Sequence, residues 1–409
     1  MTGQRKNIKL CDLERCSGCM ACLQKCSNEA IGVIFVKGFA YPSIDNDLCR
    51  KCGQCIDVCP ILNRKELRGN KHENEEKCIA AYSKNSEDRI NSSSGGIFSV
   101  LAKKVIAQGG VVFGAAWNDN MLLKHRFIDS VADLDVLRRS KYVQSDIGNT
   151  YQEALAFLKN NRKVLFCGTP CQIAGLKYFL GGREYENLVT IDVLCQGVPS
   201  PKLFDKYKCE IEKELNAKIT DCNFRSKNYG WRCGLLLLLL RLAPQNKIHN
   251  MINEKNAFYN SFIKEYFMRP SCYNCSFKKD DLGYYSDITL ADFWRIGNRV
   301  PLEIDNYEKG ISAIVLNSDK GKAFLHSCEQ DIVMTERTWK EFETNGGLRT
   351  SRKPQNNDEA YEYLLHHSWF ETQNKFFPVT IRQRLKIWAF MLLGERRIRK
   401  ILQLGGKIK

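Results

Sequence analysis

Short apolar runs alternate with amphipathic stretches through the middle of the chain. The runs are rich in β-branched and aromatic residues, and they lie at 79–83, 111–117, 164–168, 188–195 and 287–292. Residues with helical apolar spacing separate several of them, at 98–107, 149–160, 172–180 and 201–215. Ser200 and Pro201 suit the N-cap and first position of the last helix. Strands that alternate with helices in this way favour an α/β core with a mixed, partly parallel sheet.

This pattern is absent from residues 61–77, which are polar and highly charged, so we expect a linker over 66–77. The longest apolar stretches, 235–240 and 387–393, are far shorter than the roughly 20 residues of a membrane-spanning helix. The first residues carry charges and lack the apolar segment of a secretory signal. We therefore expect a cytoplasmic chain that does not cross a membrane. Its 409 residues suggest two or three domains.

Cysteine is frequent, with 19 residues in the chain, of which nine precede residue 60. In a reducing compartment, metal or redox ligands are a better interpretation of these thiols than disulfides. Two runs have the spacing C-x₂-C-x₂-C-x₃-C of bacterial ferredoxin loops, and Pro60 follows the second. The fourth cysteine of each run ordinarily reaches the other cluster, so the sequence predicts two interleaved 4Fe–4S sites. The expected ligands are Cys16, Cys19, Cys22 and Cys59 for one cluster, and Cys49, Cys52, Cys55 and Cys26 for the other.

Smaller features of these loops follow the same interpretation. Gly18 and Gly53 lie inside the loops, where a missing Cβ lets backbone amides approach the cluster sulfurs. Ser27 stands where the first loop usually has a proline, which affects a turn and no ligand. A pair of zinc sites is the alternative, and two complete runs at matched spacing argue against it. Cys11 precedes the pattern without ligand spacing and is interpreted as an ordinary thiol.

Four later cysteines are candidates for a third cluster. Cys171 and Cys195 each follow a predicted strand, at 164–168 and 188–194. If those strands are parallel neighbours, both cysteines lie at carboxyl ends, where open α/β sheets place their ligands. Cys272 and Cys275 add a C-x₂-C pair. The alternative is that Cys171 and Cys195 are small buried hydrophobic residues, as free cysteines often are.

A small-residue turn opens the predicted helix at 98–107. It contains Ser94, Gly95, Gly96 and Ser99. Free amides at a helix N-terminus suit a phosphate group, although a Ser/Gly-rich turn is more often only a cap. The G-x-G-x-x-G spacing of a Rossmann fingerprint is absent from the sequence here.

The order of several motifs resembles the family of coenzyme F420 hydrogenase/dehydrogenase beta subunits, fused behind a dicluster ferredoxin. The motifs are Ser94–Ser99, Ser140–Ser145, Gly168–Gln172, Cys195–Ser200, Phe224–Lys227 with Gly230 and Trp231, Cys272–Cys275 and Asp287–Trp294. The resemblance covers about residues 78 to 330. It implies a family core in two parts, at 78–160 and 161–335. The cysteine runs place a small α+β dicluster domain at 1–65, and we expect a helical basic tail at 336–409, beyond the resemblance.

The resemblance also implies cofactors. The family binds FAD in an α/β core with its own iron–sulfur cluster, and members handle the deazaflavin coenzyme or reduce chlorophyll precursors. Its cluster cysteines would fall on Cys171, Cys195, Cys272 and Cys275. The turn of Ser94, Gly95, Gly96 and Ser99 would lie, with Lys141, near flavin or substrate. A helix cap and a surface lysine are the structural alternatives, and no catalytic residue is assigned.

The net charge of +16 is uneven along the chain. Residues 380–409 hold nine Lys or Arg and one Glu, interleaved with apolar residues such as Leu385, Trp388 and Leu392. A basic helix of this kind either lies on an anionic membrane surface or packs on the protein's own core. We expect no nucleic acid as partner, because no recognised nucleic-acid-binding fold accompanies the charge.

Taken together, the motifs predict an iron–sulfur flavoprotein oxidoreductase whose ferredoxin module delivers electrons to FAD. Its partner would be a redox protein or a small-molecule hydride carrier. A non-catalytic electron-transfer subunit without flavin is the competing hypothesis. An assembly protein with vestigial cofactors is a third, against which the complete ligand sets argue.

Overall fold

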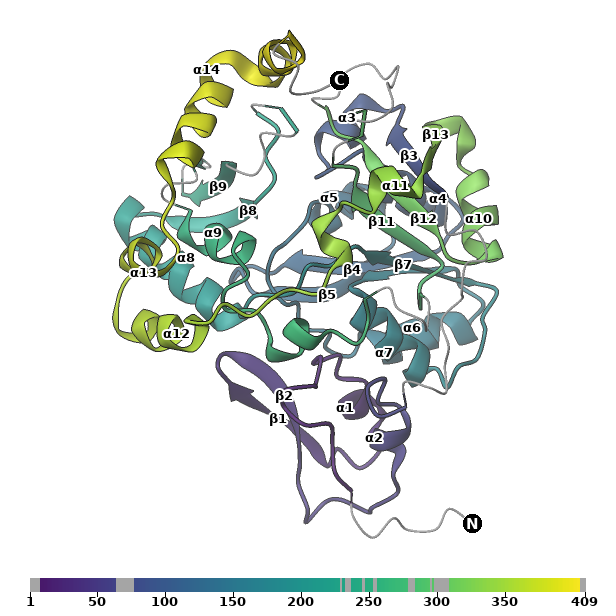
Figure 1. Ribbon diagram of the computed structural model, residues 1–409. Coiled ribbons are helices and arrows are strands. Elements are labelled where there is room, and N and C mark those ends of the chain that lie inside the picture. Colours follow the sequence, from purple (N-terminus) through teal and green to yellow (C-terminus); the bar gives the residue numbers. More distant parts are fainter. Residues whose placement is uncertain are drawn as a thin grey trace.

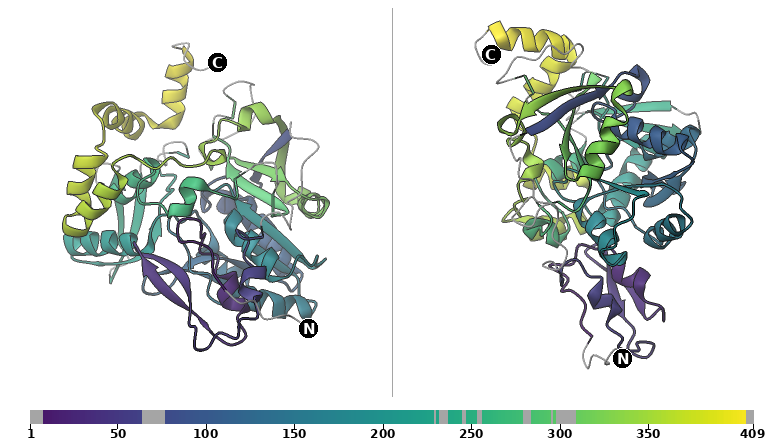
Figure 2. Two further views of the ribbon diagram at one scale, coloured as in Figure 1. Left: turned by 60° about the horizontal axis from the view of Figure 1, so that its bottom comes forward. Right: turned by 90° about the vertical axis from the view of Figure 1, so that its right-hand side faces the viewer.

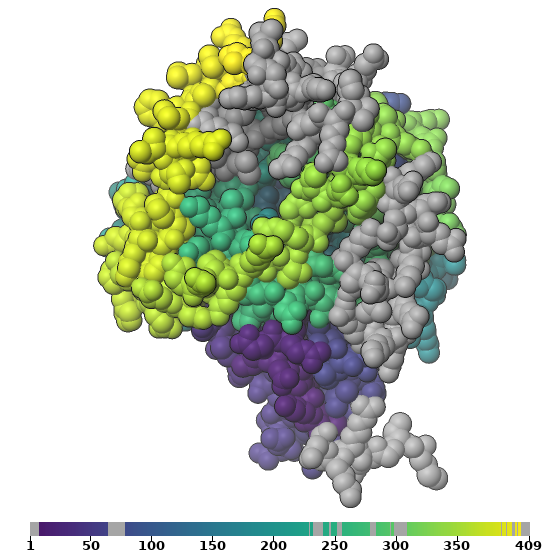
Figure 3. Space-filling view, in the orientation of Figure 1, coloured from purple at the N-terminus to yellow at the C-terminus, as the bar shows by residue number. Residues whose placement is uncertain are grey.

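A small N-terminal module and a larger body make up the computed structural model (Figure 1). The structure describes residues 8–63, 77–228, 230–231, 237–244, 247–252, 256–278, 284–294, 296–297 and 309–404. The module pairs β1 (Ile31–Val36) with β2 (Phe39–Ile44) in an antiparallel hairpin and adds two short helices, α1 (Ala21–Lys25) and α2 (Gln54–Asp57). It projects from the body as a separate lobe in Figure 3. The prediction of a small α+β domain before the core is thereby confirmed, while the predicted linker lies almost entirely outside the described residues.

The body is built on a mixed sheet with the strand order β13-β3-β12-β11-β7-β6-β4-β5. Strands β11, β7, β6 and β4 are parallel, and antiparallel strands flank them. This arrangement confirms the predicted fold class. The bounds are β3 Lys77–Ser83, β4 Val111–Trp117, β5 Leu123–Ile128, β6 Val164–Gly168, β7 Leu188–Val193, β11 Ile288–Asp292, β12 Ser312–Leu316 and β13 Ile332–Thr338. The segments 78–160 and 161–335 both contribute strands, and β13 extends past residue 335.

The central strands β4 and β6 are almost entirely apolar because both faces of the sheet are covered, whereas β7 and β11 also bury the polar residues Thr190, Asp192 and Thr289. Along β6, Val164 and Phe166 pack on one face and Leu165 on the other. Helices α6 (Thr150–Lys159) and α7 (Pro170–Phe179) cover the first face. Helices α4 (Ile97–Ala107), α5 (Leu134–Leu137) and α10 (Asp319–His326) cover the second.

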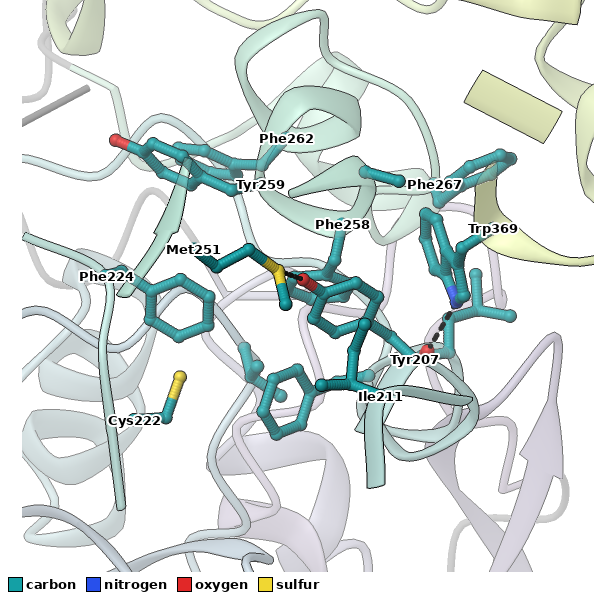
Figure 4. Close-up of a cluster of buried hydrophobic side chains, with 14 of the residues drawn as sticks. Tyr207, Ile211, Cys222, Phe224, Met251, Phe258, Tyr259, Phe262, Phe267 and Trp369 are labelled. Atoms are coloured by element: carbon teal, nitrogen blue, oxygen red, sulfur yellow. Dashed lines mark hydrogen bonds between the residues drawn. The ribbon is translucent and has the colours of Figure 1, made fainter. Parts of the chain in front are cut away.

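A second core, rich in aromatic residues, lies beside the sheet (Figure 4). Trp369 stands edge-on to the rings of Phe258 and Tyr207, and its indole N–H donates to the backbone oxygen of Leu203 at 3.3 Å. Its elements are α8 Pro201–Leu215, β8 Lys218–Asn223, β9 Leu237–Ala243, β10 Lys247–Ile252, α9 Ala257–Ile263, α12 Asn357–His366 and α13 Trp369–Phe376. Two helices of the predicted tail therefore belong to the folded body. The remaining short helices are α3 (Ser86–Ile90) and α11 (Trp339–Phe342).

Only the last helix of the tail stands apart. Helix α14 (Ile381–Leu404) is broken at Gly394, and it lies at the end of the molecule opposite the N-terminal module (Figure 2). Ile387 on this helix is buried. The described residues contain no helix that combines the length and apolar content needed to span a membrane.

The module docks on α6 and α7 through polar groups of α1. The side-chain oxygen of Gln24 accepts from the backbone N–H of Tyr151 at 2.9 Å, and its backbone oxygen accepts from the Gln152 amide at 2.6 Å. Gly175 in α7 lies against Cys19, so closely that a Cβ there would be 2.9 Å from the Cys19 Cβ. These contacts place one end of the ferredoxin-like module directly on the body.

Candidate functional site

The eight cysteines of the module surround two small cavities. One cavity, which we call the proximal site, faces the body and is lined by Cys16, Cys19, Cys22 and Cys59. The other, the distal site, is lined by Cys26, Cys49, Cys52 and Cys55. Cys55 lines both cavities. The chain thus brings together the two quartets expected from the spacing, each with one cysteine from the other loop.

Local backbone conformation explains how the loops fold around these sites. Gly18 and Gly53 have φ of 69° and 83°, a region that glycine adopts without the steric penalty of a Cβ. Cys16 and Cys19 are buried, whereas Cys52 is exposed. The proximal site is therefore shielded by the body and the distal site is open to a partner.

Cys11 is a residue that spacing did not reveal. It lines the proximal cavity together with Cys59. The sequence predicted an ordinary thiol, because no ligand spacing includes Cys11. Only the path of the N-terminal segment over the module brings it to the cavity.

The four later cysteines also line a single cavity, of about 40 Å³, which we call the third site. Strands β6 and β7 are parallel neighbours, as the prediction for Cys171 and Cys195 required. Thr169 and Gln172 form a capping box that begins α7, and this box holds Cys171 in the first helical turn. Cys272 lies in a 3₁₀ turn (Pro270–Asn274) and Cys275 follows it.

The chemistry of this donor set fits an iron–sulfur cluster. All four donors are thiols, and burial raises the pKa of Cys272 to about 12 and that of Cys171 well above its usual value. Deprotonation of such buried thiols requires compensation by a metal centre. Among the residues that the structure describes, no three His, Cys, Asp or Glu are grouped as ligands of a single metal ion. The amine of Lys278 donates to the backbone oxygen of Cys195 and brings a positive charge to this site.

A much larger cavity, of about 290 Å³, lies next to the third site at the carboxyl ends of β6 and β7. This size is close to the lower end of small-molecule sites, about 300 Å³. Three of the expected cofactor-binding residues, Ser94, Gly96 and Lys141, line it. Aromatic, apolar and polar groups complete the wall, among them Phe98, Leu137, Tyr142, Phe262, Asp292 and Ser312.

Gly95 and Ser99 support this cavity from behind. A Cβ on Gly95 would lie 2.4 Å from the backbone oxygen of Ala81, so only glycine fits against β3. Ser99 is fully buried and its hydroxyl accepts from the guanidinium of Arg138 at 3.0 Å. The structure gives both residues a structural part in forming the turn.

One end of the large cavity is basic. Arg138, Arg139 and Lys141 line it together with Ser92–Ser94, and Arg138 also pairs with the buried carboxylate of Asp88. The amine of Lys141 donates to the backbone oxygen of Arg138 at 2.6 Å, and burial lowers its pKa to about 8. Lys141 is therefore a wall residue and not the surface lysine of the alternative.

A neutral network forms another part of the wall. His125 Nε2 lies 3.0 Å from the backbone oxygen of Cys167, which can only accept, so Nε2 carries the proton. Nδ1 then accepts from the Ser145 hydroxyl at 2.9 Å, and the Gln172 amide donates to that hydroxyl oxygen at 3.0 Å. Burial lowers the pKa of His125 to about 4, so the ring is uncharged near neutral pH.

The four cavities form an unbroken row. The distal and proximal sites share Cys55, and the proximal and third sites share Ser17 and Ile61. Cys171 and Cys195 line both the third site and the large cavity. Each candidate cofactor site is thus separated from the next only by shared wall residues.

Two family models match the chain. Residues 161–341 match the family described as the C terminus of the coenzyme F420 hydrogenase/dehydrogenase beta subunit. Residues 15–62 match the 4Fe-4S dicluster domain. The recognition made from the motifs is thereby confirmed for both parts of the chain.

Individual proteins give a consistent but more distant picture. In Methanosarcina mazei, a protein named as the F subunit of F(420)H(2) dehydrogenase is 26% identical over 371 residues, which cover 87% of this chain and 94% of that protein. Among solved structures, a chain of the xenon-derivatised F420-reducing NiFe hydrogenase complex from Methanosarcina barkeri matches with a TM-score of 0.43 and 14% identity. That match covers 66% of this chain and 84% of the other.

Proposed function

We propose that this chain is an iron–sulfur flavoprotein oxidoreductase of the family of coenzyme F420 hydrogenase/dehydrogenase beta subunits. It carries an N-terminal 4Fe-4S dicluster domain. Electrons would pass between three 4Fe–4S clusters and FAD, and on to a substrate that accepts or donates a hydride, such as a deazaflavin coenzyme. The row of adjoining cavities is the observation that carries this proposal. Electron transfer slows steeply with distance, and adjoining sites keep each step short.

We propose that FAD binds in the large cavity. The turn at Ser92–Ser94 and the cations of Arg138 and Lys141 would hold the anionic pyrophosphate. FAD, when bound, exchanges single electrons with clusters and two electrons as a hydride with a substrate. The amine of Lys227 donates to the backbone oxygens of Arg89 and Ser94, each at 2.6 Å, and so fixes the turn in place.

One part of the cavity wall is an uncharged hydrogen-bond network built by the chain's own polar groups. His125 is neutral: its Nε2 donates to the backbone oxygen of Cys167, and its Nδ1 accepts from the Ser145 hydroxyl, which in turn accepts from the Gln172 amide. Lys141, with a pKa near 8, is a group that can hold or release a proton beside a bound ring. We propose no further step for it, because its amine is held by backbone oxygens.

We further propose that the chain works as an electron-transferring subunit of a redox complex, since the Methanosarcina mazei relative is named as a subunit of F(420)H(2) dehydrogenase. The exposed Cys52 makes the distal site the point where a redox partner would exchange electrons. The competing proposal is a non-catalytic subunit that passes electrons to its partner without flavin.

Anaerobic purification with cofactor extraction separates these proposals. The first predicts released FAD at about one per chain and flavin absorbance that bleaches on reduction. It also predicts reduction or oxidation of an added deazaflavin by the loaded protein. If the protein contains iron but retains no flavin even after incubation with FAD, the competing proposal of a non-catalytic subunit is supported.

We also propose that residues 380–409 contact the surface of an anionic membrane, on the cytoplasmic side. Ile381, Leu385, Trp388 and Leu392 follow a 4-3-4 spacing on one face of α14, and each is at least 60% exposed. Exposed Arg382 and Arg384 flank this stripe. Charge attraction and an apolar face that is not covered by the body together suit an interfacial helix.

A further inference from the structure

Arg269 is a fully buried arginine that joins the ferredoxin-like module to the third site. It immediately precedes the 3₁₀ turn of Cys272, and its backbone oxygen accepts from the Cys272 N–H at 2.8 Å. Its side chain, only 1% exposed, extends in the other direction into the module. One residue thus contacts both the loop of the third site and the loop of the proximal site.

The guanidinium is held by acceptors from three parts of the chain. Nε donates to the backbone oxygen of Cys16 at 2.7 Å, and Nη2 donates to that of Ala40 at 3.0 Å. Nη1 donates to the side-chain oxygen of Gln144 at 2.9 Å. Nη2 also lies 3.9 Å from the Cys16 sulfur, and the guanidinium carbon lies 4.1 Å from the centre of the Tyr41 ring.

Gly18 makes room for this side chain. A Cβ on Gly18 would lie 2.6 Å from Nη1 and 2.7 Å from the guanidinium carbon of Arg269. Glycine is therefore required at position 18 for two reasons, its φ of 69° and the close approach of Arg269. The loop and the arginine fit each other across the domain boundary.

The acceptors of Arg269 are all neutral. No ion pair joins it to a carboxylate within the part of the chain that the structure describes. An arginine side chain brings a positive charge into the interior, and a buried charge without compensation destabilises the fold. The groups around it that carry negative charge when loaded with iron are the proximal site, through Cys16, and the third site, through Cys272.

We propose that Arg269 is a positioning residue that holds the module on the body and supplies the positive charge between the proximal and third clusters, raising the reduction potentials of both. This inference rests on the proposed function. A cluster gains one negative charge on reduction, and a nearby cation stabilises the reduced form more than the oxidised form. Charge and hydrogen bonding near the cluster are known means of setting its potential.

The test is an EPR-monitored redox titration of the full, iron-loaded chain. Arg269→Gln should make reduction of the proximal cluster at least tenfold less favourable. For a one-electron couple, this lowers its midpoint potential by about 59 mV or more. The distal cluster, which Arg269 does not contact, is the internal control and should keep its potential. An unchanged proximal potential in a folded variant with full iron content would overturn the proposal.

A second pair of variants covers the case in which Arg269→Gln does not fold. Gln144→Glu keeps Arg269 but puts a carboxylate beside its guanidinium. Because this carboxylate neutralises the positive charge, the midpoint potential of the proximal cluster should fall as expected for Arg269→Gln. Gln144→Leu removes the same hydrogen bond without adding charge and should have a smaller effect. Equal potentials in these two variants would also contradict the charge role.

The outcome is independent of whether FAD or the third cluster is present. If extraction shows no flavin, or iron analysis shows only two clusters, the proposed function fails. The proximal potential would still report on Arg269, because Cys16 belongs to the module that matches a dicluster domain.

Discussion

At the scale of single residues, the third site gives the most direct chemical prediction. A 4Fe–4S cluster uses four thiolates, so twelve cysteines predict about twelve iron atoms per chain. The double variant Cys272→Ser/Cys275→Ser should lower this to about eight, measured by iron analysis after anaerobic reconstitution. Cys209→Ser is the matched control, because Cys209 is exposed and lines none of the four cavities. Eight iron atoms in both the parent chain and the double variant would refute the third cluster.

Gly175 tests the docking of the module. Gly175→Val places its Cβ 2.8 Å from the Tyr151 hydroxyl and 2.9 Å from the Cys19 Cβ, and neither neighbour is the end of a flexible chain. Overpacking of this kind costs about 1–3 kcal/mol, so the melting temperature should fall. Gly32→Val in β1 is the control, since a Cβ there meets nothing within 4 Å. A melting temperature equal to that of the parent chain would show that the module does not pack on α7 in solution.

His125 predicts a specific pH dependence. Its pKa is lowered from 6.5 to about 4 on folding, so between these values the unfolded state binds more protons than the folded state. Stability should therefore fall as the pH drops from about 6.5 toward 4, by up to about 1.4 kcal/mol per pH unit. His125→Gln, which can still donate to the Cys167 oxygen but does not titrate, should lose this part of the slope. Melting temperatures of the two proteins that fall in parallel between pH 7 and 5 would contradict the assignment.

Sequence reasoning found the residues that form local patterns and missed those that depend on distant partners. The cysteine quartets are visible because their spacing is short and regular. Arg269 lies next to a recognised cysteine pair, yet its acceptors on Cys16 and Ala40 are 253 and 229 residues away in the chain. Neither periodicity nor composition could predict that Arg269 contacts Cys16 and Ala40. Ser99 was expected near a cofactor, whereas its hydroxyl holds Arg138 behind the cavity wall.

At the scale of elements, the parallel centre of the sheet was predictable and its edges were not. Strands β4 and β6 are buried on both faces and are nearly continuous apolar runs, and β7 is interrupted only by the buried Thr190 and Asp192. β5 and β13 are edge strands with exposed positions, and their sequences, such as Leu123–Ile128, resemble those of loops or helices. Each takes its place in the sheet by antiparallel pairing with a neighbouring strand, and the local sequence pattern does not specify this pairing.

Helix α14 carries the prediction that belongs to this scale. Binding of the full chain to anionic vesicles should weaken as salt rises, because each Lys or Arg near the surface contributes roughly 1 kcal/mol that salt screens. Trp388 is 60% exposed, so Trp388→Glu should reduce vesicle binding while leaving the melting temperature nearly unchanged. Ile387→Glu is the contrasting variant, because Ile387 is 2% exposed and its substitution should lower the melting temperature. If the parent chain does not co-sediment with anionic vesicles, the proposed membrane contact is wrong. The exposed apolar face of α14 would then be available to a protein partner.

At the scale of the whole molecule, the row of cavities divides between two bodies. The proximal and distal sites lie wholly in the module, and every residue that lines the large cavity lies at or after Ser92. Ser17 and Ile61 of the module complete the wall of the third site. The module is therefore needed for electron input and for covering the third site, while the flavin cavity is formed by the body.

A chain that begins at residue 77 should separate these two roles. It keeps the sheet from β3 onward and all the walls of the large cavity, so it should still bind FAD, measured as flavin absorbance that remains after desalting. It lacks the backbone oxygens of Cys16 and Ala40 that accept from Arg269, so we expect the loop of the third site to bind its cluster less tightly. Reduction of the bound flavin by an external one-electron donor should slow at least tenfold relative to the full chain, because the distal and proximal sites are missing. A folded and soluble fragment that takes up no FAD would show that the cavity requires the module, and one that is reduced as fast as the full chain would show that electrons do not travel along the row.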